Sequence, residues 1–477
     1  MLKLNDDILY YIFQELNDDG NSLFTCLLVN KLWCELTVPI LWRFPLKYIQ
    51  INNKNRTRLL FKIILLHLSE HSIKLLMDIN IKIISAEKPK QKLSFNYVSF
   101  CKYLGIYKIF IILDLGSHLC CNQKRCLSQE IYKLFINECS NIIYLNSDEL
   151  IYPLYQYPGA NICLSNLSEL DCKSNLESSV FYGLAKICRL IEKIHITFTV
   201  DNLGLTKLIE AQKHIKYIRI NNFSVGYEYG KMTQALEKHA HSILYLELVI
   251  NETYSCFHLP NLINLQSLII VSVNEEPFHS LGQLFVKHLM TRVYYNLQIL
   301  ELTRIPLRVA ANIIKNTNGN IWKIKIRTSK FNHSKEYIQS IYKYCPNIKI
   351  TSVLLNNRNL DELKNLFINC IHLEALDVIV INENGRYEDN YEKFLDLLVK
   401  FAPITLYKLH INPFFYSKQS LKLFFNNWKG RKILHLYDHS GNWSELIQNN
   451  EEIVGYRDCK DFWNVENYTK ITWYDEF

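Results

Sequence analysis

Residues 297–326, LQILELTRIPLRVAANIIKNTNGNIWKIKI, contain the pattern that decides the fold. An aliphatic-x-x-aliphatic-x-aliphatic motif occupies 297–302 and returns at 321–326. Alternation within each copy predicts a short β-strand with one apolar face. The residues between copies often have a helical pattern, as at 335–344 and 391–401. The repeating unit is therefore predicted to be strand, turn, helix.

The same motif recurs through most of the chain beyond residue 140. Successive copies begin about 22 to 33 residues apart, which brackets the period of leucine-rich repeats. We predict a solenoid over 139–452 that resembles the leucine-rich-repeat fold. Clear copies begin at Leu167, Ile191, Ile215, Ile243, Leu265, Leu297 and Ile321, looser ones at Ile348, Leu373, Leu406 and Ile433, and a short copy at Ile142 opens the series.

Cysteine positions support the same repeat from an independent direction. Cys139, Cys188, Cys345 and Cys370 each precede the leading aliphatic of a copy by three residues. A small apolar thiol suits a helix end that packs against the next strand. The register resembles the cysteine-containing subclass of leucine-rich repeats, which often follows an F-box. Disulfides are not expected, because no secretory signal is visible.

Residues 1–44 have a different, helical pattern. Ile8, Ile12 and Leu16 recur every four residues, and neighbouring apolar residues widen the stripe. Asn5 and Ser22 are predicted to cap two helices. A unit of this size is marginal alone, so its apolar surface should continue into a partner or into the rest of the chain.

This segment resembles an F-box, which in its family binds a Skp-type adaptor and through it a cullin and a RING subunit. Asn5 stands where the family usually has proline, and Asn30 where it often has cysteine. The alternative is that the same residues form only the core of an N-terminal helical cap. The resemblance implies that the adaptor-binding residues are Leu4, Ile8, Leu9, Ile12, Phe13, Leu16, Val29 and Trp33.

The predicted fold class is α/β: a three-helix F-box at 1–44 followed by a curved solenoid with parallel strands inside and helices outside. Residues 45–138 are interpreted as a linker of degenerate early repeats that couples the two parts rigidly. The aromatic tail, 453–477, is expected to cap the last repeat. The alternative is that Trp473 to Phe477, with Asp475 and Glu476, lies in the concave face as a self-binding peptide. The whole arrangement resembles the large fungal family of F-box proteins with leucine-rich repeats.

Side chains that flank the middle aliphatic of each copy are expected to form the target-binding face. Their charge changes sign along the row, whereas a groove that tracks phosphates should have one sign, so a protein target is favoured over nucleic acid. Tyr217, Arg219 and Tyr245 form the preferred patch, because Tyr and Arg are common in binding hot spots. The predicted target-binding residues are Lys193, His195, Tyr217, Arg219, Tyr245, Glu247, Glu301, Lys323 and Lys325.

Composition narrows the function classes. The 477 residues are 49% hydrophobic, yet no run of 18 apolar residues would span a bilayer, so no membrane association is expected. The formal net charge of +8 is dilute over this length. With no secretory signal, the expected location is the cytoplasm, the nucleus or both.

Catalysis has no visible motif. The sequence contains no P-loop, dinucleotide fingerprint, G-x-S-x-G elbow or H-E-x-x-H, and no cofactor is expected. His118, Cys120, Cys121 and Cys126 suggest zinc ligands, but their spacing lacks paired C-x-x-C knuckles, so no metal site is predicted.

The sequence therefore predicts a non-catalytic substrate receptor of a cullin–RING ubiquitin ligase. The alternative is a ligase-independent interaction scaffold whose F-box is degenerate, and a nucleic-acid-binding solenoid is a third class, which the mixed charges disfavour. The identity of the target does not follow from the sequence.

Overall fold

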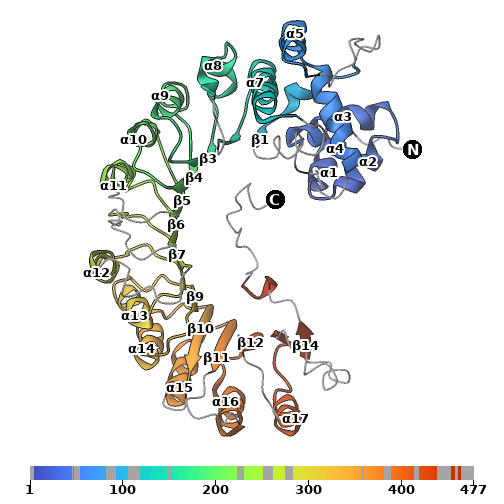
Figure 1. The fold of residues 1–477 in the computed structure, drawn as a ribbon. Coiled ribbons are helices and arrows are strands. Elements are labelled where there is room, and N and C mark those ends of the chain that lie inside the picture. The colour runs from blue at the N-terminus through green and yellow to red at the C-terminus, as the bar shows by residue number, and fades with distance from the viewer. Residues whose placement is uncertain are drawn as a thin grey trace. The chain divides into compact units, whose positions relative to one another are not determined.

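The structure, a computed structural model, forms two compact units: residues 1–215 and residues 216–472. Within the second unit, Figure 1 shows helices along one side of the strands. Residues 473–477 lie outside the described part of the chain, as do most residues of the predicted aromatic cap. The described residues are 5–45, 47, 54–81, 93–105, 119–147, 152–222, 230–250, 261–273, 283–356, 359–380, 388–412, 418–437, 453–456 and 460–463.

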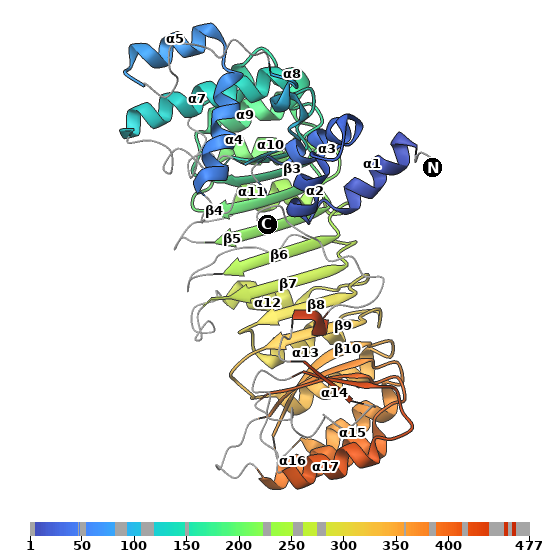
Figure 2. The same cartoon turned by 90° about the vertical axis from the view of Figure 1, so that its right-hand side faces the viewer.

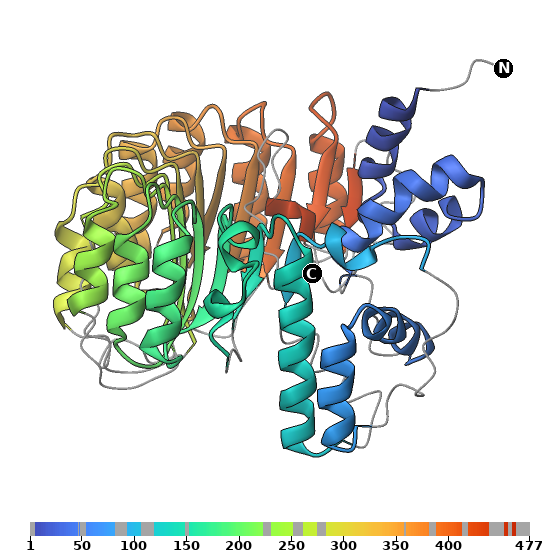
Figure 3. The same cartoon turned by 90° about the horizontal axis from the view of Figure 1, so that it is seen from above.

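The first unit begins with three short helices, as the sequence predicts. Leu9 and Phe13 of α1 (Asp6–Glu15) are buried, and so is Leu23 of α2 (Gly20–Cys26). The Phe13 ring lies edge-on to Trp33 of α3 (Lys31–Arg43), with 5.0 Å between centroids. Figure 3 shows these helices in dark blue. Their shared core is built from the apolar stripe of α1 and the central helix α3.

The caps of these helices differ in part from the prediction. Asp19, not Ser22, caps α2, because its carboxylate accepts a hydrogen bond from the Ser22 amide at 3.1 Å. Asn30 caps α3 by accepting from the Trp33 amide at 2.9 Å. Asn5 occupies the N-cap position of α1, but its side chain makes no capping hydrogen bond. The prediction of Ser22 as the cap is wrong because the helix begins at Gly20, three residues before the first apolar residue, Leu23.

The helical module is tied directly to the first strand of its unit. The Arg43 carbonyl at the end of α3 accepts from the Lys102 amide at 2.8 Å, next to β1 (Tyr103–Gly105). The Phe44 ring contacts Tyr103 with 5.7 Å between centroids. These two contacts join the end of α3 to β1, and rigid coupling by residues 45–138 stays a prediction.

Beyond α3, helices alternate with short parallel strands in the first unit. Within the described residues, β1 pairs with β2, β2 with β3 and β3 with β4, so the strands follow one another in chain order. Figure 3 shows α7 as a long teal helix. The elements are α4 (Lys54–Leu66), α5 (Glu70–Asp78), η1 (Tyr97–Phe100), β1, α7 (Cys121–Glu138), β2 (Tyr144–Asn146), η2 (Leu154–Gln156), α8 (Ala160–Cys163), β3 (Glu169–Lys173), α9 (Ser178–Ile187), β4 (Lys193–Phe198) and α10 (Leu203–Glu210).

The second unit continues the alternation of strand and helix. Each of its described strands pairs in parallel with the next one along the chain. The elements are β5 (Tyr217–Asn222), α11 (Gly230–Glu237), β6 (Tyr245–Ile250), β7 (Ser267–Ser272), α12 (Gln283–Thr291), β8 (Ile299–Thr303), α13 (Leu307–Lys315), β9 (Lys323–Arg327), α14 (Ser334–Tyr344), β10 (Ile350–Leu355), α15 (Leu360–Asn369), β11 (Ala375–Val380), α16 (Glu388–Phe401), β12 (Lys408–Asn412), α17 (Lys418–Asn427), β13 (Leu434–Tyr437), β14 (Ile453–Tyr456) and η3 (Lys460–Trp463).

The register of these strands aligns the middle aliphatic residue of each copy. Leu246 lies opposite Leu268, Leu268 opposite Leu300, and Leu300 opposite Ile324, and all four are fully buried. Parallel strands in chain order, most of them followed by a described helix, define a leucine-rich-repeat-like solenoid. The α/β fold class is thereby confirmed.

The four cysteines of the predicted register occupy equivalent places. Cys139, Cys188, Cys345 and Cys370 are the C-cap residues of α7, α9, α14 and α15, and all are buried. Each amide donates to the carbonyl four residues earlier, at 2.7 to 2.9 Å. Burial raises the pKa of Cys188 and of Cys370 to about 12. These thiols are therefore inert packing groups, as the sequence pattern predicts.

Two buried asparagines satisfy the backbone where strands turn into helices. The Asn202 amide donates to the Ser174 and Leu176 carbonyls at 2.9 and 2.7 Å. The Asn359 amide donates to the Leu354 carbonyl at 3.0 Å, while its oxygen accepts from the Asn356 amide at 2.8 Å. A buried polar group that is fully bonded fixes the turn without a desolvation penalty.

We expect Asn359→Ala to lower the free energy of unfolding of the second unit by about 1–3 kcal/mol, because buried backbone groups lose their partners. Exposed Asn369, whose amide bonds to a carbonyl of its own helix, provides a matched control. Asn369→Ala should change stability by less than about 0.5 kcal/mol. Urea unfolding followed by circular dichroism measures both variants, and equal effects would contradict this role for Asn359.

Candidate protein interface

The N-terminal module exposes a set of large apolar side chains. On α1, Ile8, Tyr11 and Ile12 are 49%, 67% and 44% exposed. After α2, Leu28 is 86% and Val29 is 52% exposed. Such residues cost free energy in water unless a partner covers them. The module therefore presents an apolar surface together with its own core.

The predicted adaptor-binding residues fall into groups with different environments. Ile8, Ile12 and Val29 are exposed, Leu16 and Trp33 are half-buried, and Leu9 and Phe13 belong to the module's core. Leu4 lies outside the described residues. Sequence reasoning did not single out Tyr11, Phe24 or Leu28, which are also exposed. Periodicity predicts that a helix has a broad apolar face. It does not predict which apolar residues of that face are buried and which are exposed.

We use the term ladder face for the strand side chains that flank the middle aliphatic residues. All nine predicted target-binding residues lie on it, two in the first unit and seven in the second. Neighbouring strands place these side chains opposite one another in register. Most of their charges are therefore paired across strands. The sequence showed that the sign of the charge changes along the row, but not which residues pair.

In the first unit, the ladder face is a short run of charge pairs. Lys193 Nζ lies 3.5 Å from Glu169 Oε2, and His195 Nδ1 lies 3.2 Å from Asp171 Oδ1. The Asn146 amide donates to the other oxygen of Asp171 at 3.1 Å. All five residues are buried or half-buried. The Lys193–Glu169 pair and the Asn146 hydrogen bond offset part of the cost of burying the carboxylates of Glu169 and Asp171.

The preferred aromatic patch is assembled in the second unit. The rings of Tyr217 and Tyr245 lie 6.4 Å apart. Arg219 Nε lies 3.2 Å from Glu247 Oε1, and the Tyr245 hydroxyl donates to Glu247 Oε2 at 2.6 Å. The structure thus brings together the three residues of the predicted patch and shows that Glu247 organises them.

A second cluster joins β8, β9, β11 and β12. Lys323 and Lys325 lie 2.8 and 3.8 Å from the carboxylate oxygens of Glu301. Arg327 pairs with Asp377, which is fully buried. Asp377 also lies 2.7 Å from His410 Nδ1, and a carboxylate accepts only, so that ring nitrogen carries the proton.

Arg327 is not among the target-binding residues that the sequence predicts. The available signal was its spacing, two residues beyond Lys325 on the same strand and hence on the same face. Together, Lys323, Lys325 and Arg327 form a row of three cations on β9.

The tail segment η3 lies over this cluster. Figure 2 looks onto the strands and shows η3 in dark red in front of β8 and β9. Trp463 packs against the cation row, and Phe462 is fully buried near Ile350, Ala375 and Tyr437. This placement differs from a simple cap over the last repeat. Aromatic content identified a covering segment, but not the strands that it covers.

Burial lowers the pKa of Lys325, and the neighbouring cations Lys323 and Arg327 act in the same direction. Glu301 and Asp377 oppose this shift. The cation row is thus partly desolvated, which strengthens its attraction to an aromatic ring above it.

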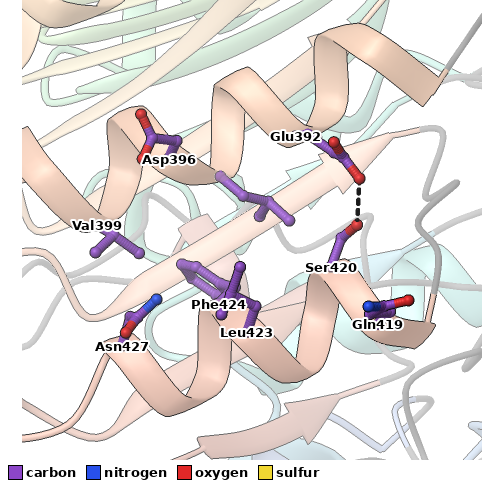
Figure 4. Close-up of a pocket in the computed structure, with 9 residues that line it drawn as sticks. Glu392, Asp396, Val399, Gln419, Ser420, Leu423, Phe424 and Asn427 are labelled. Carbon is purple, nitrogen blue, oxygen red and sulfur yellow. Dashed lines mark hydrogen bonds between the residues drawn. The ribbon is translucent and has the colours of Figure 1, made fainter.

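A separate groove lies between α16 and α17 (Figure 4). Its wall includes Glu392, Asp396, Leu423 and Phe424, and the Ser420 hydroxyl donates to Glu392 at 2.8 Å across one end. The groove is open to solvent. No converging set of catalytic groups lines this part of the structure.

Within the described ranges, no three His, Cys, Asp or Glu side chains come together to hold a metal ion. Cys120, Cys121 and Cys126 are exposed at the start of α7, and His118 lies outside those ranges. The same part of the chain contains no helix with the length and apolarity to cross a membrane.

Comparisons with known proteins do not assign this chain to a family. No protein-family model matches the chain, and no curated protein matches its sequence. Among solved structures, the leucine-rich repeat-containing protein LegL7 from Legionella pneumophila is similar at 10% identity and a TM-score of 0.29, over 65% of this chain and 84% of that chain. The assignment of the fold therefore depends on strand order and register.

We expect Asp377→Ala to destabilise the second unit by roughly 3 kcal/mol, because Arg327 and His410 lose a fully buried partner. Asp396→Ala is the matched control, since Asp396 forms an exposed pair with Lys400 on α16. That control should cost less than about 1 kcal/mol. Urea unfolding of the two variants decides the matter, and a loss below about 1 kcal/mol for Asp377→Ala would refute the buried network.

We also expect β14 to loosen on acidification. Burial lowers the pKa of His435, and the Lys408 cation lowers it further. The His435 ring stacks on Tyr456 of β14 with 5.5 Å between centroids, and its Nδ1 lies 3.0 Å from the Tyr456 hydroxyl. The Tyr407 ring lies edge-on to His435 at 5.9 Å. Because this pKa is lower in the folded unit than in the unfolded chain, the stabilisation from the neutral His435 ring is complete above about pH 6.5 and is lost as pH falls through the lower value.

Hydrogen exchange of the β14 amides at pH 7.5 and 5.5 measures this effect. Wild-type protein should lose protection at pH 5.5, whereas His435→Gln should show a smaller pH difference. An identical pH response in the two proteins would show that another group is responsible.

Proposed function

We propose that this chain is the substrate receptor of a cullin–RING ubiquitin ligase. In this proposal, the N-terminal module binds a Skp-type adaptor, and the ladder face binds a protein target. The observation that carries it is the apolar surface formed by Ile8, Ile12 and Val29, with Tyr11 and Leu28. These residues are exposed on a small helical module whose sequence resembles an F-box.

The energetics of this surface support a partner. Burial of apolar area is worth about 25 cal/mol per Å², so covering several large side chains supplies useful binding energy. The module's core is already complete without them, since Leu9, Phe13 and Leu23 are buried. The exposed residues are therefore dispensable for folding and available for contact with another protein.

Asn5 and Asn30 both depart from the F-box pattern, but only Asn5 argues against an adaptor-binding F-box. Asn30 has a clear structural task, because it caps α3 at the Trp33 amide. Asn5 lies at the N-cap position of α1 without a side-chain cap. The rival proposal, a ligase-independent scaffold, therefore draws its support mainly from Asn5.

Target binding by the ladder face fits its chemistry. The face combines Tyr217, Tyr245, Arg219 and Glu247 with mixed charge, which suits a protein surface better than a polyphosphate backbone. A receptor needs no catalytic group, because it raises the local concentration of the target near the conjugating enzyme.

The experiment is co-purification of the full chain with a Skp-type adaptor. We expect wild-type protein to retain the adaptor and Ile12→Asp/Val29→Asp to bind at least tenfold more weakly, because each substitution would bury a carboxylate in an apolar contact. Both residues are exposed, so circular dichroism should show an unchanged fold.

Ile162→Asp is the matched control, because Ile162 is 68% exposed on α8 of the same unit and lies outside the module. It should bind the adaptor as wild type does. Failure of the wild-type chain to bind would favour the scaffold, whereas equal loss in the control would show a general effect of added charge.

A further inference from the structure

We infer that the ladder face from β9 to β13 is a binding site for a partner peptide with two adjacent aromatic residues, and that Phe462 and Trp463 of the same chain occupy it as an internal ligand. This inference rests on the proposed binding of a protein target by the ladder face. It does not depend on the adaptor.

The first part of the site recognises the Trp463 ring through charge. Lys325 Nζ lies 5.2 Å, Arg327 Cζ 5.5 Å and Lys323 Nζ 5.9 Å from the ring centroid. Each such contact is worth about 0.5–2 kcal/mol, more when water is excluded. The three cations on β9 repel one another. The electron-rich face of the Trp463 ring attracts all three at once. Glu301 lowers the remaining repulsion.

The second part of the site recognises Phe462 through packing. Phe462 is fully buried against Ile350, Ala375 and Tyr437, with Tyr456 and Trp463 at the edge. Its ring lies 5.2 Å from Tyr437 and 5.8 Å from His410. The ladder face is charged on β9 but apolar at Ile350 of β10 and at Ala375 of β11. Two different aromatic subsites therefore lie side by side.

The resident segment is well suited to exchange. Phe462 and Trp463 are held by ring contacts and packing, whereas β14 pairs with β13 along four residue positions. η3 has only four residues and follows β14 after three more, so its effective concentration at the site is on the order of millimolar. A partner peptide must compete with the tail at this effective concentration, so the tail weakens the apparent affinity of the site for the peptide.

The test uses a fluorescent peptide with the sequence of residues 460–467, KDFWNVEN, and the full-length chain. Phe462→Ala/Trp463→Ala empties the site, so we expect it to bind the peptide about tenfold more tightly than wild type. The peptide KDAANVEN should bind neither protein. Lys325→Glu in the double-alanine background should remove binding, whereas Lys335→Glu, at an exposed position on α14, should not.

A second measurement needs no variant. Excess KDFWNVEN should displace the tail of the wild-type chain and speed tryptic cleavage after Lys460, while KDAANVEN should not. Equal peptide affinity for wild type and double-alanine protein, with cleavage unchanged, would overturn the inference and leave η3 as a permanent cover. Adaptor binding is measured separately, so loss of adaptor binding with intact peptide competition would refute the receptor role alone.

Discussion

Burial of one aliphatic row is the constraint on which the second unit depends. Leu246, Leu268, Leu300 and Ile324 stack in register on neighbouring strands, and all four are fully buried. A single copy would leave these side chains in water, so stability comes from stacking. Buried Cys345 and Cys370 end α14 and α15 just before β10 and β11.

Once the aliphatic row fixes the register, the ladder face follows. Residues one position to either side of each middle aliphatic meet their counterparts on the next strand, as Arg219 meets Glu247. Opposite charges there pair across strands, as Lys193 with Glu169 and Lys323 with Glu301 also do, and pairing offsets part of their burial cost. Binding specificity then depends on the aromatic residues and on places where like charges gather, of which β9 is the clearest among the described strands.

The two proposed interfaces differ in physical character. At the N-terminal module, Ile12 and Val29 offer apolar area that is exposed and separate from the folding core. At β9 to β13, the surface is already covered by Phe462 and Trp463. The first surface is exposed, so a partner would bind it by covering the apolar side chains directly. The second is covered by the tail of the same chain, so a partner would have to displace Phe462 and Trp463 in order to bind.

The sequence by itself determined the repeat, the strand positions, the cysteine C-caps and the helical N-terminal module, because those depend on local periodicity and on residue size. It also placed Tyr217, Arg219 and Tyr245 on one face. Only the tertiary structure decided that Leu9 and Phe13 face inward while Ile8 and Ile12 face outward, and that Trp463 covers Lys325. Those facts arise from packing between segments far apart in the chain, which no local pattern encodes.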